Sequence, residues 1–372
     1  MATIYITITN HGFGHAARTG SIVSELGQIP GAPRIIVNST LPEVHLRAFI
    51  RAPFELHPRP LDTGVVQSDG LGMDLPATLE KLSELRQNQA RIIAEEARFV
   101  RDEKVELILG DIPPLAAEIG AAAGVPCWMQ GNFGWDFIYR DFGPEFEPYV
   151  ETASRAYEKC ELLFQMPFHE PMGSFPNRQR VGVTGRRSEM SREETLTRIA
   201  RHMGREPAEL LEEAAAPLIM IMFGGMGLDN IPWANADRFN DDSPNPRRFL
   251  TYSDEVPDRP NILRIPPDLR AADILPHCES VVTKPGYGTM ADVYQADIGI
   301  ITIRRTGFAE APILEDALRK YFRHRIIETE DFFQGDWSFI TQPLHAPTSS
   351  DAPGRNGNGE IVNRLRDFLA RA

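Results

Sequence analysis

A glycine-rich loop near the N-terminus carries a histidine that could transfer protons. Residues 12–17 read Gly-Phe-Gly-His-Ala-Ala and follow a β-branched run at 3–9. Gly12 and Gly14 would let a substrate approach the backbone, and His15, in the first turn of a helix, would point a titratable imidazole into a cleft. The loop also formally matches the dinucleotide-binding fingerprint, but the next strand ends without the acidic residue that binds ribose. A tight turn with a solvent-facing histidine is the remaining interpretation.

A second glycine loop, at 223–227, follows the apolar run 217–223. Gly224 and Gly225 could present backbone N–H groups to a phosphate. A plain turn into the insertion 226–246 would need the same residues, so this loop alone does not distinguish the two.

A third loop, in 283–292 (TKPGYGTMAD), leads from an apolar strand into a helix that we expect to begin near Gly288 and Thr289. The free N–H groups of a helix N-terminus, with a nearby lysine, form a natural cradle for a diphosphate. The residues of that cradle would be Lys284, Gly286, Gly288 and Thr289. Asp292, one turn further, could accept hydrogen bonds from ribose hydroxyls. The alternative is a capped helix with an exposed aspartate.

Three other places carry polar side chains for which the sequence allows two interpretations each. Asp111 follows the strand 105–109, at the edge where α/β proteins bind ligands, or it caps the next helix. Asn132, Trp135 and Asp136 belong to an aromatic and polar loop that could stack on a sugar or pack between domains. Glu310 could bind sugar hydroxyls or provide the acidic start of a helix.

These residues must be positioned by two series of alternating strands and helices. In the first series we expect strands at 3–9, 34–37, 105–109 and 127–130 and helices up to about residue 28 and at 77–103 and 114–123. In the second we expect strands at 217–223, 247–252, 261–265, 280–283 and 298–303 and helices at 271–278, 288–296 and 312–322. The predicted fold class is α/β, with two parallel sheets covered by helices.

The length of 372 residues fits two domains. We predict a first domain at 1–170, a connection at 171–216 with two polar helices, and a second domain at 217–345. A linker at 346–359 and a last helix at 360–372 would follow. That helix is expected to pack back on the first domain.

Charge and cysteine content restrict the partners. The chain has 39 Lys and Arg against 52 Asp and Glu, a net charge of −13, which disfavours nucleic acid and anionic membranes. Its cysteines, Cys127, Cys160 and Cys278, are too far apart for a typical zinc site or disulfide framework. No signal peptide, membrane span or metal-binding Asp-x-Asp pair after a strand is expected, so we predict a cytoplasmic protein without a metal.

The blocks NHGFGHAAR (10–18), DIPPLA (111–116), GNFGWDFIY (131–139) and KPGYGT (284–289) resemble those of GT-B nucleotide-sugar glycosyltransferases. The resemblance is greatest to the N-terminal, glycosyltransferase-like half of L-arabinokinases, and it extends through 304–312 and 335–337. It implies two Rossmann-like domains that face each other across a cleft. Arabinokinases continue into a galactokinase-like domain with the ATP site, whereas this chain ends at Ala372, so phosphorylation of arabinose is not expected.

The resemblance also implies roles for individual residues. His15 would lie beside the reacting sugar, Asp292 would bind the ribose, and Glu310 would contact the donor sugar. Gly288 and Thr289 would bind the diphosphate. Lys284 replaces the histidine of the plant glycosyltransferase signature, so that signature does not give the donor.

Together these observations predict transfer of a sugar from a nucleotide sugar, expected to be UDP-linked, to an unknown hydroxyl acceptor. No cofactor beyond this co-substrate is expected. His15 would be the general base of an inverting displacement, and Asp111 would orient it or bind the acceptor. Gly12, Gly14, Arg18, Asn132, Trp135 and Asp136 would form the acceptor side. A UDP-sugar hydrolase or epimerase and a nucleotide-sugar sensor or pseudoenzyme are the alternatives, and the oligomeric state is left open.

Overall fold

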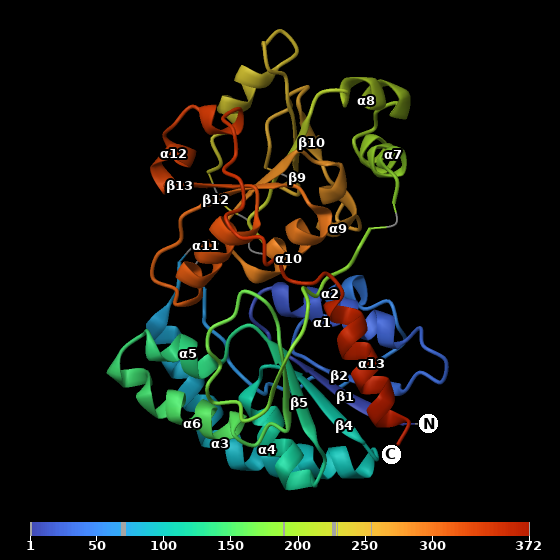
Figure 1. The fold of residues 1–372 in the computed structure, drawn as a ribbon, viewed down its shortest axis with the longest axis vertical. Coiled ribbons are helices and arrows are strands. Elements are labelled where there is room, and N and C mark those ends of the chain that lie inside the picture. Colours follow the sequence, from blue (N-terminus) through green and yellow to red (C-terminus); the bar gives the residue numbers. More distant parts are fainter. Residues whose placement is uncertain are drawn as a thin grey trace.

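Two parallel β-sheets organise the chain. The computed structural model describes residues 2–67, 72–188, 190–224, 228, 230–253 and 255–371. These residues form two halves, each with one sheet between helices, and Figure 1 shows the first half below the second. The predicted α/β class with two parallel sheets is confirmed.

In the first half, the strand order is β3-β2-β1-β4-β5-β6-β7, and each neighbouring pair is parallel. The strands are β1 (Thr3–Ile8), β2 (Arg34–Asn38), β3 (Glu55–Leu56), β4 (Leu107–Asp111), β5 (Cys127–Gly131), β6 (Leu162–Gln165) and β7 (Arg178–Arg180). The helices are α1 (Gly14–Leu26), α2 (Glu43–Phe49), α3 (Leu75–Asp102), α4 (Pro114–Ala123), α5 (Trp135–Arg140), η1 (Pro144–Phe146) and α6 (Glu147–Tyr157).

The second half repeats this arrangement with the order β10-β9-β8-β11-β12-β13, again parallel. Its strands are β8 (Leu218–Ile221), β9 (Arg248–Thr251), β10 (Ile262–Arg264), β11 (Ser280–Thr283), β12 (Gly299–Ile303) and β13 (His324–Ile327). Its helical segments are η2 (Trp233–Phe239), α9 (Ala271–Ile274), η3 (Leu275–His277), α10 (Tyr287–Ala296), α11 (Glu310–Tyr321), α12 (Thr329–Phe333) and η4 (Ser338–Ile340). Helices α7 (Arg192–His202) and α8 (Pro207–Glu213) precede this half, and α13 (Gly357–Leu369) follows it.

Each sheet has one point where successive strands switch from one side to the other, between β1 and β4 and between β8 and β11. Ligands of open α/β sheets bind in the crevice outside the carboxyl ends of the strands at such a point. Ile8 at the end of β1 pairs with Asp111 at the end of β4, so the first crevice contains the loop with Gly12 and Gly14. The second crevice contains Gly224 and residues 284–286.

Several elements were not predicted, and they share weak local signals. β3 (EL), β7 (RQR) and β13 (HRII) are short and contain charged residues, and β6 (LLFQ) has four residues. Strands this short carry little periodicity. The stretch 226–246 is not simply a polar loop, because η2 buries Trp233 in edge-to-face contact with Trp337, at 6.0 Å between ring centroids. Residues 225–227 and 229 lie outside the described part.

The C-terminal helix α13 lies on the first half, beside α1, as Figure 1 shows in red. Phe368 packs edge-to-face against Trp128 at 4.9 Å, and the Arg364 guanidinium lies 5.6 Å from the same ring. The predicted boundaries at 170, 216 and 345 stay predictions, although β7 extends the first sheet into the stretch expected to be a connection.

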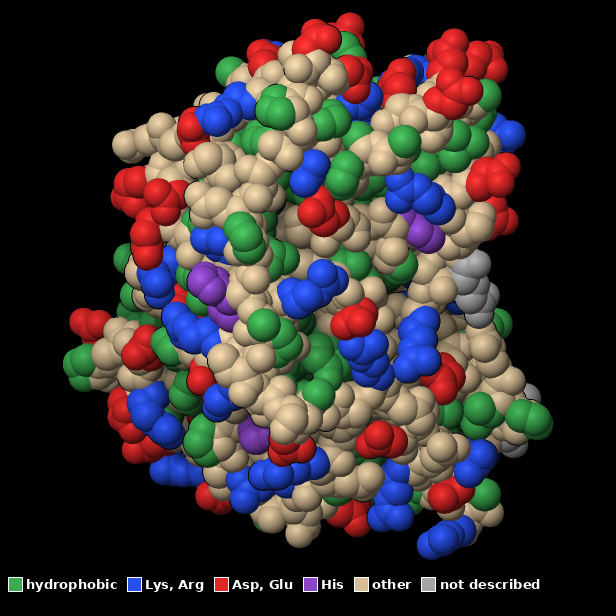
Figure 2. Space-filling model, turned by 45° about the horizontal axis from the view of Figure 1, so that its top comes forward, with side chains coloured by type: hydrophobic (Ala, Val, Ile, Leu, Met, Phe, Trp, Pro, Cys, Tyr) green, Lys and Arg blue, Asp and Glu red, His purple; other side chains and the backbone are tan. Residues whose placement is uncertain are grey.

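The surface charge is unevenly distributed. Figure 2 shows acidic side chains gathered at the upper right, where α7 and α8 lie, and Lys and Arg side chains across the middle of this face. A net charge of −13 therefore does not prevent local binding of an anion. No helix in the described ranges is long and apolar enough to cross a membrane.

Candidate functional site

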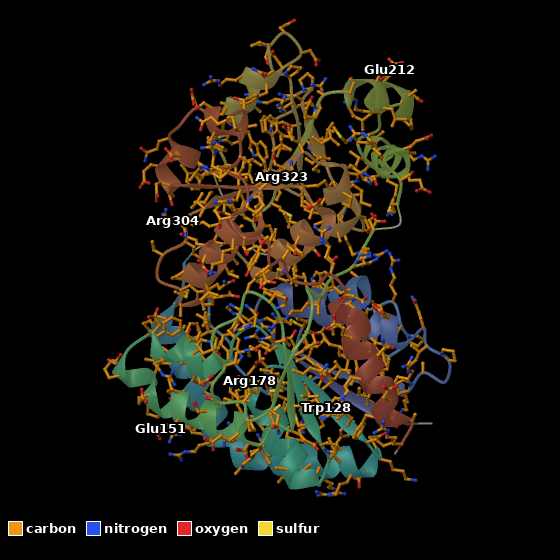
Figure 3. All side chains as sticks on the ribbon, in the orientation of Figure 1. Trp128, Glu151, Arg178, Glu212, Arg304 and Arg323 are labelled. Atoms are coloured by element: carbon orange, nitrogen blue, oxygen red, sulfur yellow. The ribbon has the colours of Figure 1, made fainter. Side chains whose placement is uncertain are left out.

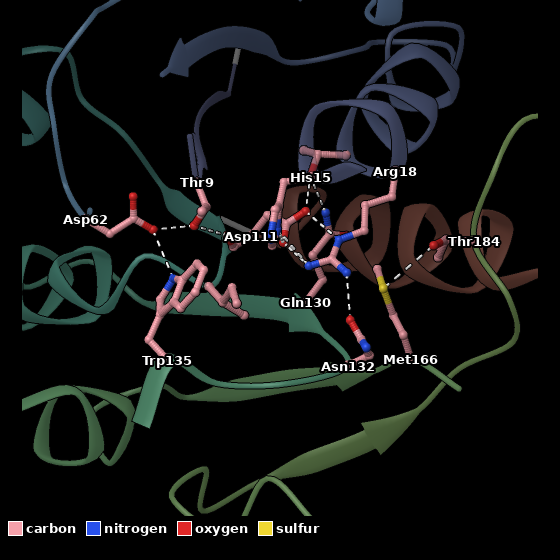
Figure 4. A network of polar contacts seen from close by, with 12 residues as sticks. Thr9, His15, Arg18, Asp62, Asp111, Gln130, Asn132, Trp135, Met166 and Thr184 are labelled. Atoms are coloured by element: carbon pink, nitrogen blue, oxygen red, sulfur yellow. Dashed lines mark hydrogen bonds and ion pairs between the residues drawn. The ribbon is translucent and has the colours of Figure 1, made fainter. Parts of the chain in front are cut away.

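The centre of the site is Asp111, which lies at the end of β4 below the first turns of α1 (Figure 4). His15 and Arg18 are three residues apart on α1, so both side chains reach the same carboxylate. The alternative interpretation of Asp111 as a helix cap is wrong, because α4 begins after Pro113 and has no side-chain cap. Asp111 is completely buried.

Four donors satisfy this carboxylate. Oδ1 accepts hydrogen bonds from His15 Nδ1 at 2.8 Å and from Arg18 Nη2. Oδ2 accepts from Arg18 Nε at 2.8 Å and from Thr19 Oγ1 at 2.6 Å. Burial alone would raise the pKa of Asp111, but Arg18 and His15 outweigh it and hold that pKa well below its ordinary value. Asp111 is therefore ionised throughout the neutral range.

The tautomer of His15 depends on which neighbour its Nδ1 bonds. Nδ1 lies 2.8 Å from Asp111 Oδ1, which only accepts, and 2.9 Å from Arg18 Nη2, which only donates. In the tautomer that donates to the carboxylate, Nδ1 carries the proton and Nε2 is left as a proton acceptor. Among the described residues, Nε2 has no hydrogen-bond partner. Burial, reinforced by the charge of Arg18, lowers the pKa of His15 despite the opposing effect of Asp111. A neutral imidazole oriented in this way has the form that a general base requires.

A chain of contacts leads from this cluster to the second half. Arg18 Nη1 donates to Asn132 Oδ1 at 2.8 Å, and Asn132 Nδ2 donates to Glu310 Oε1 at 2.6 Å. The Arg18 guanidinium also lies 5.2 Å from the ring of Tyr287 on α10. The structure thus brings the predicted residues Arg18, Asn132 and Glu310 to the His15 cluster. Glu310 is also the first residue of α11, so it is the acidic start of that helix as well as a neighbour of the His15 cluster.

Trp135 forms a wall of the site. Its indole lies 6.3 Å from the His15 ring and 5.3 Å from the His11 ring, and its Nε1 donates to Asp62 Oδ2 at 3.1 Å. Thr9 Oγ1 donates to the same Asp62 oxygen (Figure 4). Burial raises the pKa of Asp62 to about 6. No motif indicated Asp62, because it lies in an irregular segment outside all of them.

Asp136 does not belong to the site, contrary to expectation. Its Oδ2 accepts hydrogen bonds from Ser154 Oγ at 3.1 Å and Ser174 Oγ at 2.5 Å, inside the first half. The predicted loop 132–136 in fact leads into α5, which begins at Trp135. Adjacent residues of this short helix therefore point in different directions, and only Trp135 faces the histidines.

The two glycine loops of the opposed halves touch each other. Gly12 has a φ of +65°, which favours glycine, and Gly14 begins α1. A Cβ placed on Gly288 would lie 3.3 Å from Gly14 Cα, so the start of α10 packs directly on the start of α1. The absence of a side chain at Gly288 allows this close approach, whereas a Cβ on Gly14 would meet nothing within 4 Å.

The predicted diphosphate cradle surrounds the start of α10. Gly286 is its N-cap without a side-chain hydrogen bond, and Thr289 lies in the first turn. A Cβ on Gly224 would lie 3.8 Å from Lys284 Cε, so the second glycine loop borders this lysine. Gly225, predicted with Gly224, lies outside the described residues.

Asp292 is half-buried rather than exposed, contrary to the capped-helix alternative. Burial raises its pKa to about 7, with Arg270 opposing and Asp273 adding to the effect. Its carboxylate has no hydrogen bond or ion pair with another residue in the described ranges, and a Cβ on Gly185 would lie 3.5 Å from Oδ1. An acceptor without a partner is available for a ligand's hydroxyls.

Two residues near the site were missed as candidates. His11 stacks on Phe308 with 6.4 Å between ring centroids, and burial, with the charges of His15 and Arg305, lowers its pKa to about 3. Arg305 lies 4.3 Å from the Phe308 ring. Both were present in the blocks that carried the resemblance, but nothing local in the sequence indicated that they would meet. Across the described residues, no group of three or more His, Cys, Asp or Glu side chains could hold a metal ion.

Comparison with solved structures defines the class of fold. The chain is similar to the calicheamicin glycosyltransferase CalG4, with a TM-score of 0.65 and 14% identity over 100% of this chain and 99% of the other. It is also similar to a UDP-glucose:anthocyanidin 3-O-glucosyltransferase in complex with UDP (TM-score 0.62, 11% identity, 100% and 99% covered). A putative UDP-N-acetylglucosamine 2-epimerase from Listeria monocytogenes matches with a TM-score of 0.58 and 13% identity, over 100% and 98%. The fold is GT-B.

In sequence, the chain is 27% identical to L-arabinokinase from Arabidopsis thaliana over 376 residues. The match covers 96% of this chain but only 33% of that relative, which is consistent with its N-terminal domain. No family model matches the chain.

Proposed function

We propose that this protein is a glycosyltransferase that moves a sugar from a UDP-linked donor to a hydroxyl group of an acceptor. The observation that carries the proposal is the His15–Asp111 pair, in which Nδ1 is anchored at 2.8 Å and Nε2 has no partner in the described structure. Because the imidazole is buried and neutral, it is suited to take a proton near pH 7.

The proposed reaction is an inverting displacement that needs no metal ion. His15 Nε2 takes the proton of the acceptor hydroxyl, whose oxygen forms a bond to the anomeric carbon of the donor. The bond from that carbon to the diphosphate oxygen breaks, and UDP leaves with the electron pair. The N–H groups at the start of α10, with Lys284, stabilise the charge that develops on the leaving group.

The remaining polar residues would bind and orient. Asp111 fixes the tautomer of His15, and Arg18 fixes Asp111 through two hydrogen bonds. Asp292 would accept hydrogen bonds from the ribose, and Glu310 from hydroxyls of the donor sugar. Since the starts of α1 and α10 touch, we infer that the two halves separate to admit the donor.

Two variants test the proposal. His15→Ala should reduce transfer by about 10²- to 10⁴-fold, the usual contribution of a general base, while UDP still protects the protein in a thermal-shift assay. His202→Ala, an exposed histidine on α7, is the matched control and should keep full activity. Unchanged turnover in the His15 variant would refute its role as base.

A UDP-sugar hydrolase or epimerase is a second candidate, favoured by the similarity to the Listeria epimerase at a TM-score close to those of the transferases. Incubation with UDP-sugars in the absence of an acceptor separates the two functions. Rapid release of UDP, or a changed sugar, would support the second candidate. Tight binding of UDP-sugars without any product would instead indicate a sensor.

A further inference from the structure

A cavity lies beside the proposed reaction site, between the two halves. It has a volume of about 690 Å³ and opens between the end of α5 and the loop that joins β12 to α11. The first half contributes Phe137, Arg140 and Asp141, and the second contributes residues 304–309, Pro312 and Glu315. Figure 3 shows Arg304 at the left edge of the upper half. We call this cavity the arginine pocket.

Its three arginines are not equally engaged. Arg304 forms two ion pairs, because Nη1 donates to Glu315 Oε2 and Nε donates to Glu328 Oε1, both at 2.8 Å. Arg140 is exposed and forms no ion pair in the described part of the chain. Arg305 is different again, since its Nε and Nη2 atoms are buried and find no hydrogen-bond acceptor among the described residues.

The two unsatisfied atoms of Arg305 lie on the same edge of the guanidinium. Their N–H groups run parallel, which matches the two oxygens of a carboxylate or phosphate. The face of the guanidinium rests on the Phe308 ring at 4.3 Å, so the edge is held in a fixed orientation. Glu310 is the negative charge that acts on Arg305, but its Oε1 accepts a hydrogen bond from Asn132. A buried donor edge of this kind is costly unless an anion occupies it. Solvent does not reach these two atoms in this structure, so the anion would reach them when the two halves separate.

The position of the pocket identifies which substrate it would contact. Phe308, which supports Arg305, stacks on His11, and the His11 ring lies 6.4 Å from the His15 ring. Residues 284–289, the predicted diphosphate cradle, do not line the pocket. The wall from the first half belongs to α5, within the segment expected to bind the acceptor.

We propose that the arginine pocket binds an anionic group of the acceptor, a phosphate or a carboxylate, through the Nε–Nη2 edge of Arg305 and the charge of Arg140. The inference rests on the proposed function, and it gives the chemical class of the acceptor: a hydroxyl compound that also carries a negative charge. The hydroxyl would meet His15 while the anion is held in the pocket.

Binding is tested first without catalysis. Protein saturated with UDP, so that the diphosphate site is filled, is titrated with inorganic phosphate in a calorimeter. Wild-type protein should bind phosphate, and Arg305→Gln should weaken binding at least tenfold. Arg323→Gln, which alters an exposed arginine of the same half, is the control and should bind like the wild type. Equal affinities of the Arg305 variant and wild type would overturn the proposal.

The second measurement compares acceptors of one sugar skeleton in neutral, carboxylate and phosphate form, such as glucose, glucuronate and glucose 6-phosphate. The charged forms should have at least tenfold higher kcat/KM than the neutral form, and Arg305→Gln should remove that preference. If one of the two charged forms is preferred, that form shows whether the bound anion is a phosphate or a carboxylate. Equal rates on all three, or an effect of Arg305→Gln on the donor KM alone, would overturn the assignment. If no acceptor reacts but phosphate still binds through Arg305, the proposed transferase function fails and the anion site remains.

Discussion

Asp111→Asn offers the sharpest test of how the site is built. The substitution keeps the shape of the side chain but removes the charge that Arg18 and His15 share. Arg18 is 4% exposed, and its Nε and Nη2 atoms both donate to Asp111, so the variant leaves a buried guanidinium without its anion. Breaking a buried pair in this way costs about 3–5 kcal/mol. That is a large part of a total stability of about 5–15 kcal/mol.

The expected loss is measured by urea unfolding, followed by tryptophan fluorescence and far-UV circular dichroism. Arg18→Met should also destabilise, because it leaves a buried carboxylate with only His15 and Thr19. The double variant contains neither charge. Its loss of stability should therefore be smaller than the sum of the two single losses, by about 2 kcal/mol or more. Additive losses, or a cost of Asp111→Asn under about 1 kcal/mol, would refute the account of Asp111 as the shared anion.

The pH dependence of this difference has a definite sign. The pKa of Asp111 is lower in the folded protein than its ordinary value of about 3.9, so its ionised form stabilises the fold above that value. The stability gap between wild type and Asp111→Asn should stay constant from pH 5 to 8 and shrink as the pH falls below about 4. A gap that persists unchanged at pH 3 would contradict the charge-based explanation.

Three further variants examine other parts of the structure. Asp292→Asn should weaken UDP binding about tenfold or more in calorimetry. The wild-type affinity for UDP should rise from pH 6 to 8, because a carboxyl with a pKa of about 7 ionises over that range, whereas the affinity of the variant should not change with pH. Asp62→Asn should stabilise the protein at pH 8 by up to about 3 kcal/mol but not at pH 4, because a pKa raised to about 6 means that ionisation of Asp62 opposes folding. Equal melting temperatures of the variant and the wild type at pH 8 would count against this explanation. Gly357→Ala should lower stability by about 1–3 kcal/mol, since a Cβ there overlaps the Gly182 carbonyl, whereas Gly173→Ala, with open space around it, is the control in the same unfolding assay.

The sequence predicted the fold class because its signals are local. Buried parallel strands such as β1, TIYITI, are runs of apolar and β-branched residues, and glycines mark the turns that follow them. The resemblance through four short blocks then indicated the GT-B arrangement, which the solved structures bear out. Local patterns did not indicate α5 or η2, because short helices of aromatic residues lack a clear apolar period.

For the candidate site, the sequence by itself determined which residue types stand at the ends of the strands: a histidine after β1, an aspartate at the end of β4 and a glycine turn after β11. Only the tertiary structure decided how they combine. Residues 92 and more positions apart meet at Asp111, Asn132 of one half bonds to Glu310 of the other, and Asp136 turns inward to two serines. The physical reason is that hydrogen bonding and desolvation depend on what surrounds a side chain in space, and a sheet edge or domain junction gathers those surroundings from distant parts of the chain.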